Sequence, residues 1–301
     1  MQKPLISFDY AIKYCLRDKG DYSVVEAFIS TLLHTVGYKK NIKIIALLES
    51  ESNQETKKDK RSLADVVVED EEKNKYIIEI ERNVKDTFLH KACFNASRLI
   101  SDSLAQRSDY TQIVKIFHIS LLYFPLDQGI IYHGQTLIHD IETQKKLTIH
   151  FKCKDTKKII DATGILPEYF FISVPNFNNI LEKEIDQWLY VMKNDEVPEN
   201  FVSPYMKLVA EKLSVLRMSK NEFYEYTQYQ KKIYNDRDEL EAAEKKGLEK
   251  GLEKGREEGL EKGREEEKIE IAKNLISLGL DVEIIKKSTG LSKAEIEKLK
   301  N

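Results

Sequence analysis

Two short apolar runs on either side of a charged stretch constrain the fold of this chain more than any other feature. The runs "LADVVV" (63–68) and "YIIEIE" (76–81) have the length and aliphatic content of β-strands, and "EDEEKNK" lies between them. Two strand patterns joined by a short polar turn predict an antiparallel hairpin. The sequence therefore predicts a sheet that contains this hairpin.

Acidic residues lie within both predicted strands. Residues two apart on a strand share a face, so Glu79 and Glu81 point together while Ile78 and Ile80 face the core. Asp65, in the first strand of the hairpin, falls roughly opposite this pair. Carboxylate oxygens are the ligands that Mg²⁺ prefers, so three converging acids predict a divalent-cation site. The alternative is that all three acids face solvent on a half-exposed sheet.

The rest of the pattern alternates helices and strands. Apolar periodicity predicts helices over 8–36, 85–106, 179–193 and 204–234, buried strands over 42–50 and 113–124, and a β-rich stretch over 130–177. A polar loop is expected over 51–61. This order predicts an α/β fold, with a mixed sheet flanked by helices.

The composition changes abruptly after residue 240. Gly247, Gly251, Gly255, Gly259 and Gly263 recur at spacing four among Leu, Glu, Lys and Arg. Each glycine costs a helix about 1 kcal/mol relative to alanine. A frayed helix or a flexible tether is therefore an alternative to a rigid helix, and the glycine row would also let two helices pack closely.

The last residues predict a small helical unit. Helical patterns flank Gly279 and Gly290, and Ser292 with Glu295 has the pattern of a capping box. Short helices joined by a glycine-containing turn resemble a helix-turn-helix. One interpretation is contact with DNA or oligomerisation, and the other is a helical cap without a ligand.

We therefore expect four parts in the chain. They are a core over 1–128, an accessory β/α region packed on it over 129–240, the repeat as a linker or helix over 241–268, and a helix-turn-helix-like unit over 269–301.

Charge and cysteine content limit which partners, cofactors and cellular location the chain can have. The chain has 48 Lys and Arg against 51 Asp and Glu, a net charge of −3, so any DNA contact needs a local basic patch. Cys15, Cys93 and Cys153 form no CxxC pair, which favours reduced thiols in a cytoplasmic protein over a disulfide or zinc site. The sequence predicts no membrane span and no nucleotide cofactor, since it has no long apolar run and no glycine-rich phosphate loop.

A series of segments runs through nearly the whole chain in a specific order. They are "PLISFDYAIKYCLRDK" (4–19), "IIALLESESNQE" (44–55), the hairpin (63–81), "FLHKACFNASRLI" (88–100), "SLLYFPLDQG" (120–129), "YHG" (132–134), "PEYFFISVPNFNN", and the Gly-Glu repeat before "TGLS". In this order they resemble the Rpn family of recombination-promoting nucleases, often described as PD-(D/E)xK transposases.

The resemblance implies a restriction-endonuclease-like fold and an endonuclease that uses Mg²⁺ or Mn²⁺ on double-stranded DNA, linked to transposition or recombination. It implies that Asp65 and Glu79 bind the metal ion, with the backbone carbonyl of Ile80 as a further ligand. Glu81 stands where the family motif has lysine, which many members replace with glutamine, and Ala64 stands where the motif has proline. Both departures bear on the activity.

The charge of Glu81 is opposite to that of the motif lysine. Glu81 would serve as a further metal ligand or as the base that orients water. Alternatively it would repel the phosphate and leave a weak or inactive enzyme, acting as a DNA-binding, regulatory or assembly module.

Other residues are expected to complete the site. Lys91 is the favoured cation, because it shares a face of the next predicted helix with Asn95 and Arg98; a solvated Lys91 is the alternative. Glu26 is a further candidate metal ligand, whereas Asp9 is expected to cap a helix. The C-terminal helices would grip DNA or pair two copies as a homodimer.

Overall fold

The structure is a computed structural model, and it describes residues 5–13, 21–48, 66–84, 86–105, 110, 113–153, 156–161, 164–215 and 218–300. The chain divides into two compact units, Met1–Tyr226 and Thr227–Asn301.

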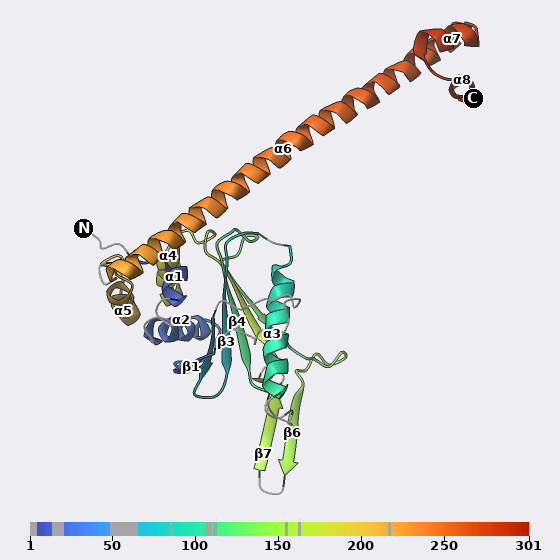
Figure 1. Cartoon of the computed structure of the whole chain (residues 1–301). Helices are drawn as coiled ribbons and strands as arrows, with labels where there is room; N and C mark the ends of the chain where they lie inside the picture. Colours follow the sequence, from blue (N-terminus) through green and yellow to red (C-terminus); the bar gives the residue numbers. More distant parts are fainter. Residues whose placement is uncertain are drawn as a thin grey trace. The chain divides into compact units, whose positions relative to one another are not determined.

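A six-stranded mixed sheet forms the centre of the first unit, in the order β1-β2-β3-β4-β8-β5 (Figure 1). Its strands are β1 (Ile44–Leu48), β2 (Val66–Asp70), β3 (Lys75–Glu81), β4 (Ile116–Leu122), β8 (Glu168–Ser173) and β5 (Ile131–Gln135). The strands β3, β4 and β8 are parallel, and the other neighbours pair antiparallel. With helices on the sheet, this arrangement confirms the predicted α/β class.

The predicted hairpin is present as β2 and β3, in a register that pairs Val66 with Ile78. Asp70 is buried at the turn, where its carboxylate accepts hydrogen bonds from the Asn74 backbone amide at 2.9 Å and the Tyr76 hydroxyl at 2.8 Å. These bonds help fix the register of the hairpin. The register matters because a slip of one residue would move every side chain of β3 to the other face.

Helix α3 (Phe88–Ala105) covers one face of the sheet (Figure 1). Its Ala96 joins Val67, Ile77 and Ile116 in a buried cluster. The side chains of β3 that share a face with Ile77 therefore lie under α3.

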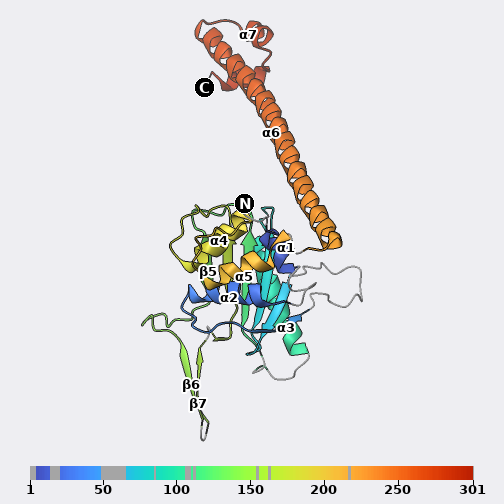
Figure 2. The same cartoon turned by 90° about the vertical axis from the view of Figure 1, so that its left-hand side faces the viewer.

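The opposite face carries α1 (Phe8–Lys13), α2 (Ser23–His34), α4 (Glu184–Asn194) and α5 (Pro204–Lys212), and Figure 2 views the unit from this side. Its core is aromatic: the ring centroids of Phe8 and Phe28 are 5.5 Å apart, and those of Phe28 and Trp188 are 5.6 Å apart. Such tilted ring pairs add to the stability that burial alone gives.

Two predicted helices differ from the structure in extent, and one predicted strand differs in burial. Residues 8–36 contain two helices, because the Asp21 carboxylate binds the backbone amide of Ser23 at 3.1 Å and starts α2 separately. Residues 204–234 likewise contain the whole of α5, which ends at Lys212, and the start of another helix at Lys220. The strand β1 was expected to be buried, but of its five residues Ile44 alone is buried, because β1 lies at an edge of the sheet.

The region expected to be an accessory part contributes directly to this unit. The strands β5 and β8 extend the main sheet, and α4 and α5 contact α2. The strands β6 (Thr148–Cys153) and β7 (Thr156–Asp161) form a separate two-stranded hairpin (Figure 2).

Helix α6 (Lys220–Ser277) runs without interruption through the glycine repeat. Beyond it, α7 (Val282–Thr289) and α8 (Lys293–Lys298) pack on its end around Ala272, Ile285 and Ile296. The predicted capping box is present. The Ser292 hydroxyl accepts a hydrogen bond from the Glu295 backbone amide, and the Glu295 carboxylate accepts one from the Ser292 backbone amide. The repeat is therefore helical, and the helical unit forms as predicted.

Candidate active site on β3 and α3

The acids of β3 lie on the face that α3 covers. The pleat of the strand puts Glu79 and Glu81 on the same side as Ile77, and Glu79 is only 2% exposed. In the parallel pairing of β3 with β4, Glu79 lies beside Ser120. A carboxylate in this position needs partners, because burying an unpaired charge is costly.

Two side chains of α3, one turn apart, supply those partners. The Lys91 ammonium donates to Glu79 Oε2 at 2.7 Å and to Glu81 Oε1 at 2.6 Å. The Asn95 amide donates to Glu79 Oε1 at 2.7 Å. Burial alone would lower the pKa of Lys91, but the hydrogen bonds to Glu79 and Glu81 outweigh it and raise the pKa to about 12. Lys91 is therefore a permanent cation shared by two acids.

Two polar residues of β4 complete the group. His118 and Ser120 are buried, and they line a small cleft together with Glu79, Glu81 and Lys91. The His118 Nδ1 and Ser120 Oγ are 3.3 Å apart, and His118 Nε2 has no hydrogen-bond partner among the described residues. Burial, and then the charge of Lys91, lower the pKa of His118 to about 3. The imidazole is therefore neutral and adds no charge to the site.

Sequence reasoning missed His118 and Ser120. The signal is present, because "IFHISLL" is a fully buried strand with two polar residues at spacing two, the same pattern as in β3. Polar side chains at that spacing share one face of the strand.

The other predicted site residues lie elsewhere. The Glu26 carboxylate accepts the Ile44 amide at 2.9 Å and pairs with Lys43 at 3.2 Å. Ile44 pairs with Asp70, at the turn end of the hairpin and away from Glu79. Glu26 therefore does not join the acids of β3, because it holds the start of β1.

Arg82 and Asp9 form an ion pair separate from this group. Asp9 lies in the first turn of α1, is fully buried, and binds the Arg82 guanidinium, which also lies 4.6 Å from the centroid of the Tyr123 ring. Arg98 is expected on the face of Lys91 and Asn95, and in the structure its guanidinium pairs with Asp102 at 3.6 Å. Neither arginine supplies a second cation to Glu79 in the structure.

Asp65, the third predicted acid, lies outside the described residues, as do Ala64 and Cys15. Within the described ranges, no group of three His, Cys, Asp or Glu side chains has the arrangement of a metal site. Glu79 and Glu81 are nevertheless oxygen donors of the type that Mg²⁺ and Mn²⁺ take. In this structure, the Lys91 ammonium bridges them.

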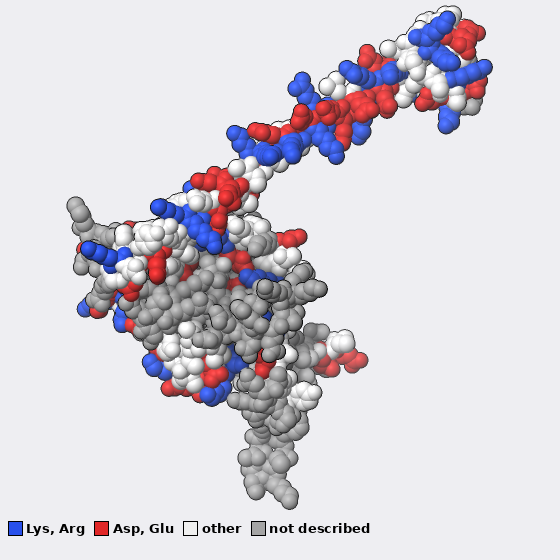
Figure 3. Space-filling view, in the orientation of Figure 1, with Lys and Arg blue, Asp and Glu red and all other residues white. Residues whose placement is uncertain are grey.

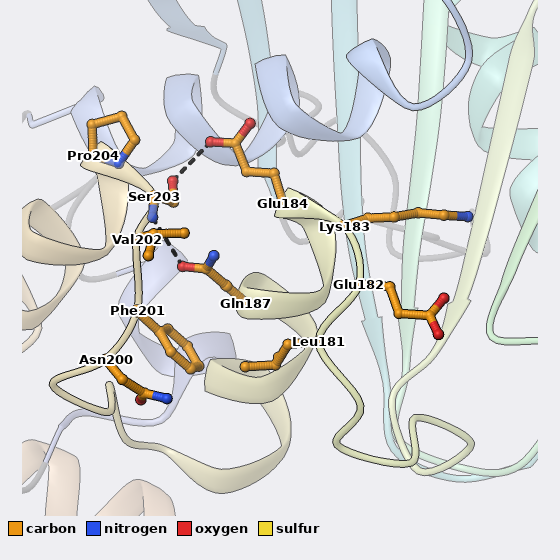
Figure 4. A pocket seen from close by; sticks show the side chains of 10 residues that line it. All are labelled: Leu181, Glu182, Lys183, Glu184, Gln187, Asn200, Phe201, Val202, Ser203 and Pro204. Atoms are coloured by element: carbon orange, nitrogen blue, oxygen red, sulfur yellow. Dashed lines mark hydrogen bonds between the residues drawn. The ribbon is translucent and has the colours of Figure 1, made fainter.

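A larger pocket of about 460 Å³ lies between the start of α4 and the segment before α5 (Figure 4). Its polar side chains bond to one another: the Ser203 hydroxyl donates to Glu184 at 2.7 Å, and the Ser203 amide donates to Gln187 at 3.2 Å. These bonds join α4 to α5, so we assign the pocket a structural role.

A second buried acid lies at the other end of β4 and β8. Glu168 is fully buried and accepts from Lys115 at 2.9 Å, Tyr38 at 2.8 Å and His133 at 2.5 Å. Burial alone would raise the pKa of Glu168, but the hydrogen bonds from Lys115, His133 and Tyr38 lower it overall. The "YHG" segment of the sequence therefore contributes His133 to the hydrogen bonds around the buried Lys115–Glu168 ion pair.

The fold, a mixed sheet flanked by helices, is that of a nuclease-like α/β protein. The chain belongs to the PD-(D/E)XK nuclease family transposases, whose family model matches residues 6–243. The model of the Rpn/YhgA-like nuclease family C-terminal HTH domain matches residues 265–301. No curated protein and no solved structure shows significant similarity to the chain. The predicted resemblance is thus confirmed, and the family indicates a nuclease-like, DNA-related function.

Across the described ranges, no helix has the length and apolar character needed to span a membrane.

Proposed function

We propose that this protein is a divalent-cation-dependent endonuclease that hydrolyses phosphodiester bonds of double-stranded DNA in transposition or recombination. The observation that carries the proposal is the position of Glu79. This carboxylate is 2% exposed and held by Lys91 and Asn95, in a chain of a nuclease family.

Mg²⁺ or Mn²⁺ would bind Asp65, Glu79 and the backbone carbonyl of Ile80. Asp65 directly precedes Val66 in the sequence, and Val66 pairs with Ile78, next to Glu79. When bound, such an ion neutralises charge on the phosphate and lowers the pKa of a bound water.

Lys91 and Glu81 would act beside that ion. The Lys91 side chain is about one-third exposed, so its flexible stem allows the ammonium to leave the acids and turn toward a phosphate. Lys91 would thereby supply the cation that the family motif places at position 81. Glu81, freed from Lys91, would serve as a metal ligand or orient the attacking water.

Plasmid cleavage tests the proposal directly. We expect the purified chain to nick supercoiled DNA with Mg²⁺ or Mn²⁺ and not with EDTA, and Glu79→Gln to abolish cleavage. Glu142→Gln, at an exposed turn residue, is the matched control and should cleave like the unaltered protein. Equal cleavage by the Glu79 variant would refute the assignment.

The second candidate is a nuclease-fold protein that binds DNA or a partner without cutting. The observation in its favour is that Lys91 bridges both acids while Glu81 replaces the motif lysine. Calorimetric titration with Mn²⁺ separates the two functions, because absence of metal binding supports the second. The Glu81→Lys variant then defines the role of this position: increased cleavage marks Glu81 as a defect, and decreased cleavage marks it as a working group.

The C-terminal unit supports DNA as the partner. Its family model is that of an HTH domain, and Lys286, Lys287 and Lys293 are exposed on α7 and α8. Exposed lysines of this kind bind backbone phosphates without reading sequence. The proposal extends to a homodimer, for which α6 carries the candidate surface.

A further inference from the structure

The strands β6 and β7 form a hairpin outside the main sheet. Among the described strands, β6 and β7 pair only with each other, and they are a separate ribbon in Figures 1 and 2. A two-stranded hairpin on its own is only marginally stable in water. A partner that lies against such a hairpin would stabilise it, and the sequence of the two strands indicates the chemistry of that partner.

The sequence around these strands is strongly basic. Residues 145–158 contain six lysines and a single acidic residue, although the whole chain has a net charge of −3. The lysines are Lys145, Lys146, Lys152, Lys154, Lys157 and Lys158. Lys145 and Lys146 lie just before β6 and are exposed. A local excess of positive charge in a chain with a negative net charge indicates a polyanion as the partner.

The pairing register of the strands gathers lysines near the turn of the hairpin. Ile149 pairs with Ile160 toward the open end, whereas Lys152 pairs with Lys157 close to the turn, and Lys158 follows in β7. Like charges directly opposite each other on neighbouring strands destabilise the pairing. A negatively charged partner at the turn end would offset this repulsion.

The other lysine-rich part of the chain has a different charge pattern. Figure 3 shows Lys and Arg intermixed with Asp and Glu along α6, so this helix presents no uniformly basic stretch on the face drawn. In the glycine repeat, lysines and glutamates likewise follow one another closely. Residues 145–158 are therefore a better candidate for a polyanion contact than the repeat.

We propose that the β6–β7 hairpin binds double-stranded DNA, with its turn end in the major groove and its lysines on the flanking phosphates. This inference rests on the proposed function, because it takes DNA as the partner, and it adds a DNA contact in the first unit to that of the HTH unit. The major groove of B-form DNA admits a two-stranded β-ribbon, whereas that of an RNA duplex is deep and narrow. Contacts to phosphates carry no sequence information, so the hairpin positions the DNA and does not select its sequence.

Fluorescence anisotropy of a labelled DNA duplex, with the full chain in EDTA, tests the proposal in the absence of cleavage. The hairpin variant combines Lys152→Gln, Lys157→Gln and Lys158→Gln. Each lysine that neutralises a phosphate contributes about 0.9 to the dependence of log affinity on log salt concentration, so the slope should become shallower by about 2.7. At physiological salt, the dissociation constant should rise by at least about tenfold. Arginine at the same three positions keeps the charge and should restore both values.

The matched control removes three exposed lysines of the same unit that lie outside the hairpin. It combines Lys39→Gln, Lys207→Gln and Lys220→Gln, and it should keep the affinity and the salt dependence of the unaltered protein. Because β6 and β7 are not strands of the main sheet, the hairpin variant should also melt at the temperature of the unaltered protein.

The outcomes separate this inference from the nuclease proposal. Unchanged DNA binding by the hairpin variant, an equal loss in the control, or tighter binding of an RNA duplex would overturn the inference and leave the active site untouched. Absence of DNA binding by the unaltered chain would overturn the inference together with the proposed substrate. Weaker binding by the hairpin variant, combined with full cleavage by Glu79→Gln, would support the hairpin contact and refute the active site.

Discussion

Two buried glutamates of the same sheet, Glu168 and Glu79, differ in how their charge is balanced. Glu168 is enclosed by Lys115, Tyr38 and His133, all of which donate to it, and Lys115 is itself 7% exposed. Glu79 accepts hydrogen bonds from Asn95 and from Lys91, and Lys91 is 34% exposed and shared with a second acid. Both carboxylates are paired, but one environment is closed and the other opens toward solvent.

We infer that this difference separates a structural ion pair at Glu168 from the proposed active site at Glu79. A closed pair whose partners are all satisfied gains nothing from a ligand and loses much if one member is removed. At Glu79, a lysine that is about one-third exposed bridges two acids beside the buried imidazole of His118, whose Nε2 has no hydrogen-bond partner among the described residues. We propose that a cation from solution replaces this lysine at Glu79, whereas Glu168 is fully buried among its partners.

The largest expected effect is the loss of stability when the buried ion pair of Glu168 with Lys115 is broken. Glu168→Gln leaves the buried Lys115 charge without its partner, so the free energy of unfolding should fall by about 3–5 kcal/mol. Glu79→Gln keeps the Asn95 bond and leaves Lys91 on Glu81, so its loss should stay within about 1 kcal/mol. Urea denaturation of both variants checks this, and equal losses would erase the distinction between the two regions.

Removing the shared lysine should sharpen the comparison. Lys91→Met takes away a cation that lies 2.7 Å from Glu79, so Mn²⁺ affinity measured by calorimetry should rise by about tenfold. DNA cleavage should fall more than DNA binding, because the ammonium is proposed to act on the reacting phosphate. Unchanged metal affinity would show that Lys91 does not compete for the site.

The loss of stability at acid pH should depend on Glu168 and its partners. The folded pKa of Glu168 is below its ordinary value of 4.5 because Lys115, His133 and Tyr38 outweigh burial. Its stabilising contribution is therefore complete above that value and is lost as pH falls through the lowered folded pKa. Between about pH 5 and pH 3, the unfolding free energy of Glu168→Gln should change less steeply than that of the unaltered protein. An equal pH dependence of the unfolding free energy in the variant and in the unaltered protein would count against this assignment.

Truncation should have the smallest effect on the first unit. A chain that ends at residue 240 keeps every strand and α1 to α5, so its melting temperature should stay within a few degrees of the full chain's. Its DNA affinity should drop and any oligomer of the full chain should be lost, because the HTH unit and most of α6 are gone. An insoluble product would mean that the first unit needs residues beyond 240.

Local patterns predicted much of the fold and part of the site. The hairpin, the alternation that puts Glu79 beside Glu81, and the capping box at Ser292 are set by residues close in sequence, and the structure confirms each of them. The expected proximity of Lys91 to the acids is found as well, while its catalytic role stays a prediction.

The features that the sequence did not predict share a physical cause. His118 approaches Lys91 only because β4 lies beside β3, and Glu168 meets Tyr38 across 130 residues of sequence. Pairing over such distances depends on strand order, which periodicity within one segment does not contain. The edge position of β1 was missed for the same reason, since an apolar run reads alike in a central and an edge strand.

The central claim, that Glu79 belongs to a divalent-cation site, is tested most directly by thermal unfolding with Mg²⁺ or Mn²⁺. Metal that binds only the folded chain should stabilise it by about 2.7 kcal/mol at a hundredfold excess over the dissociation constant, and Glu79→Gln should remove that gain. The Asp65→Asn variant should remove it as well if Asp65 shares the ion. A melting temperature of the unaltered protein that stays constant across millimolar Mg²⁺ and Mn²⁺, with and without DNA, would contradict the account.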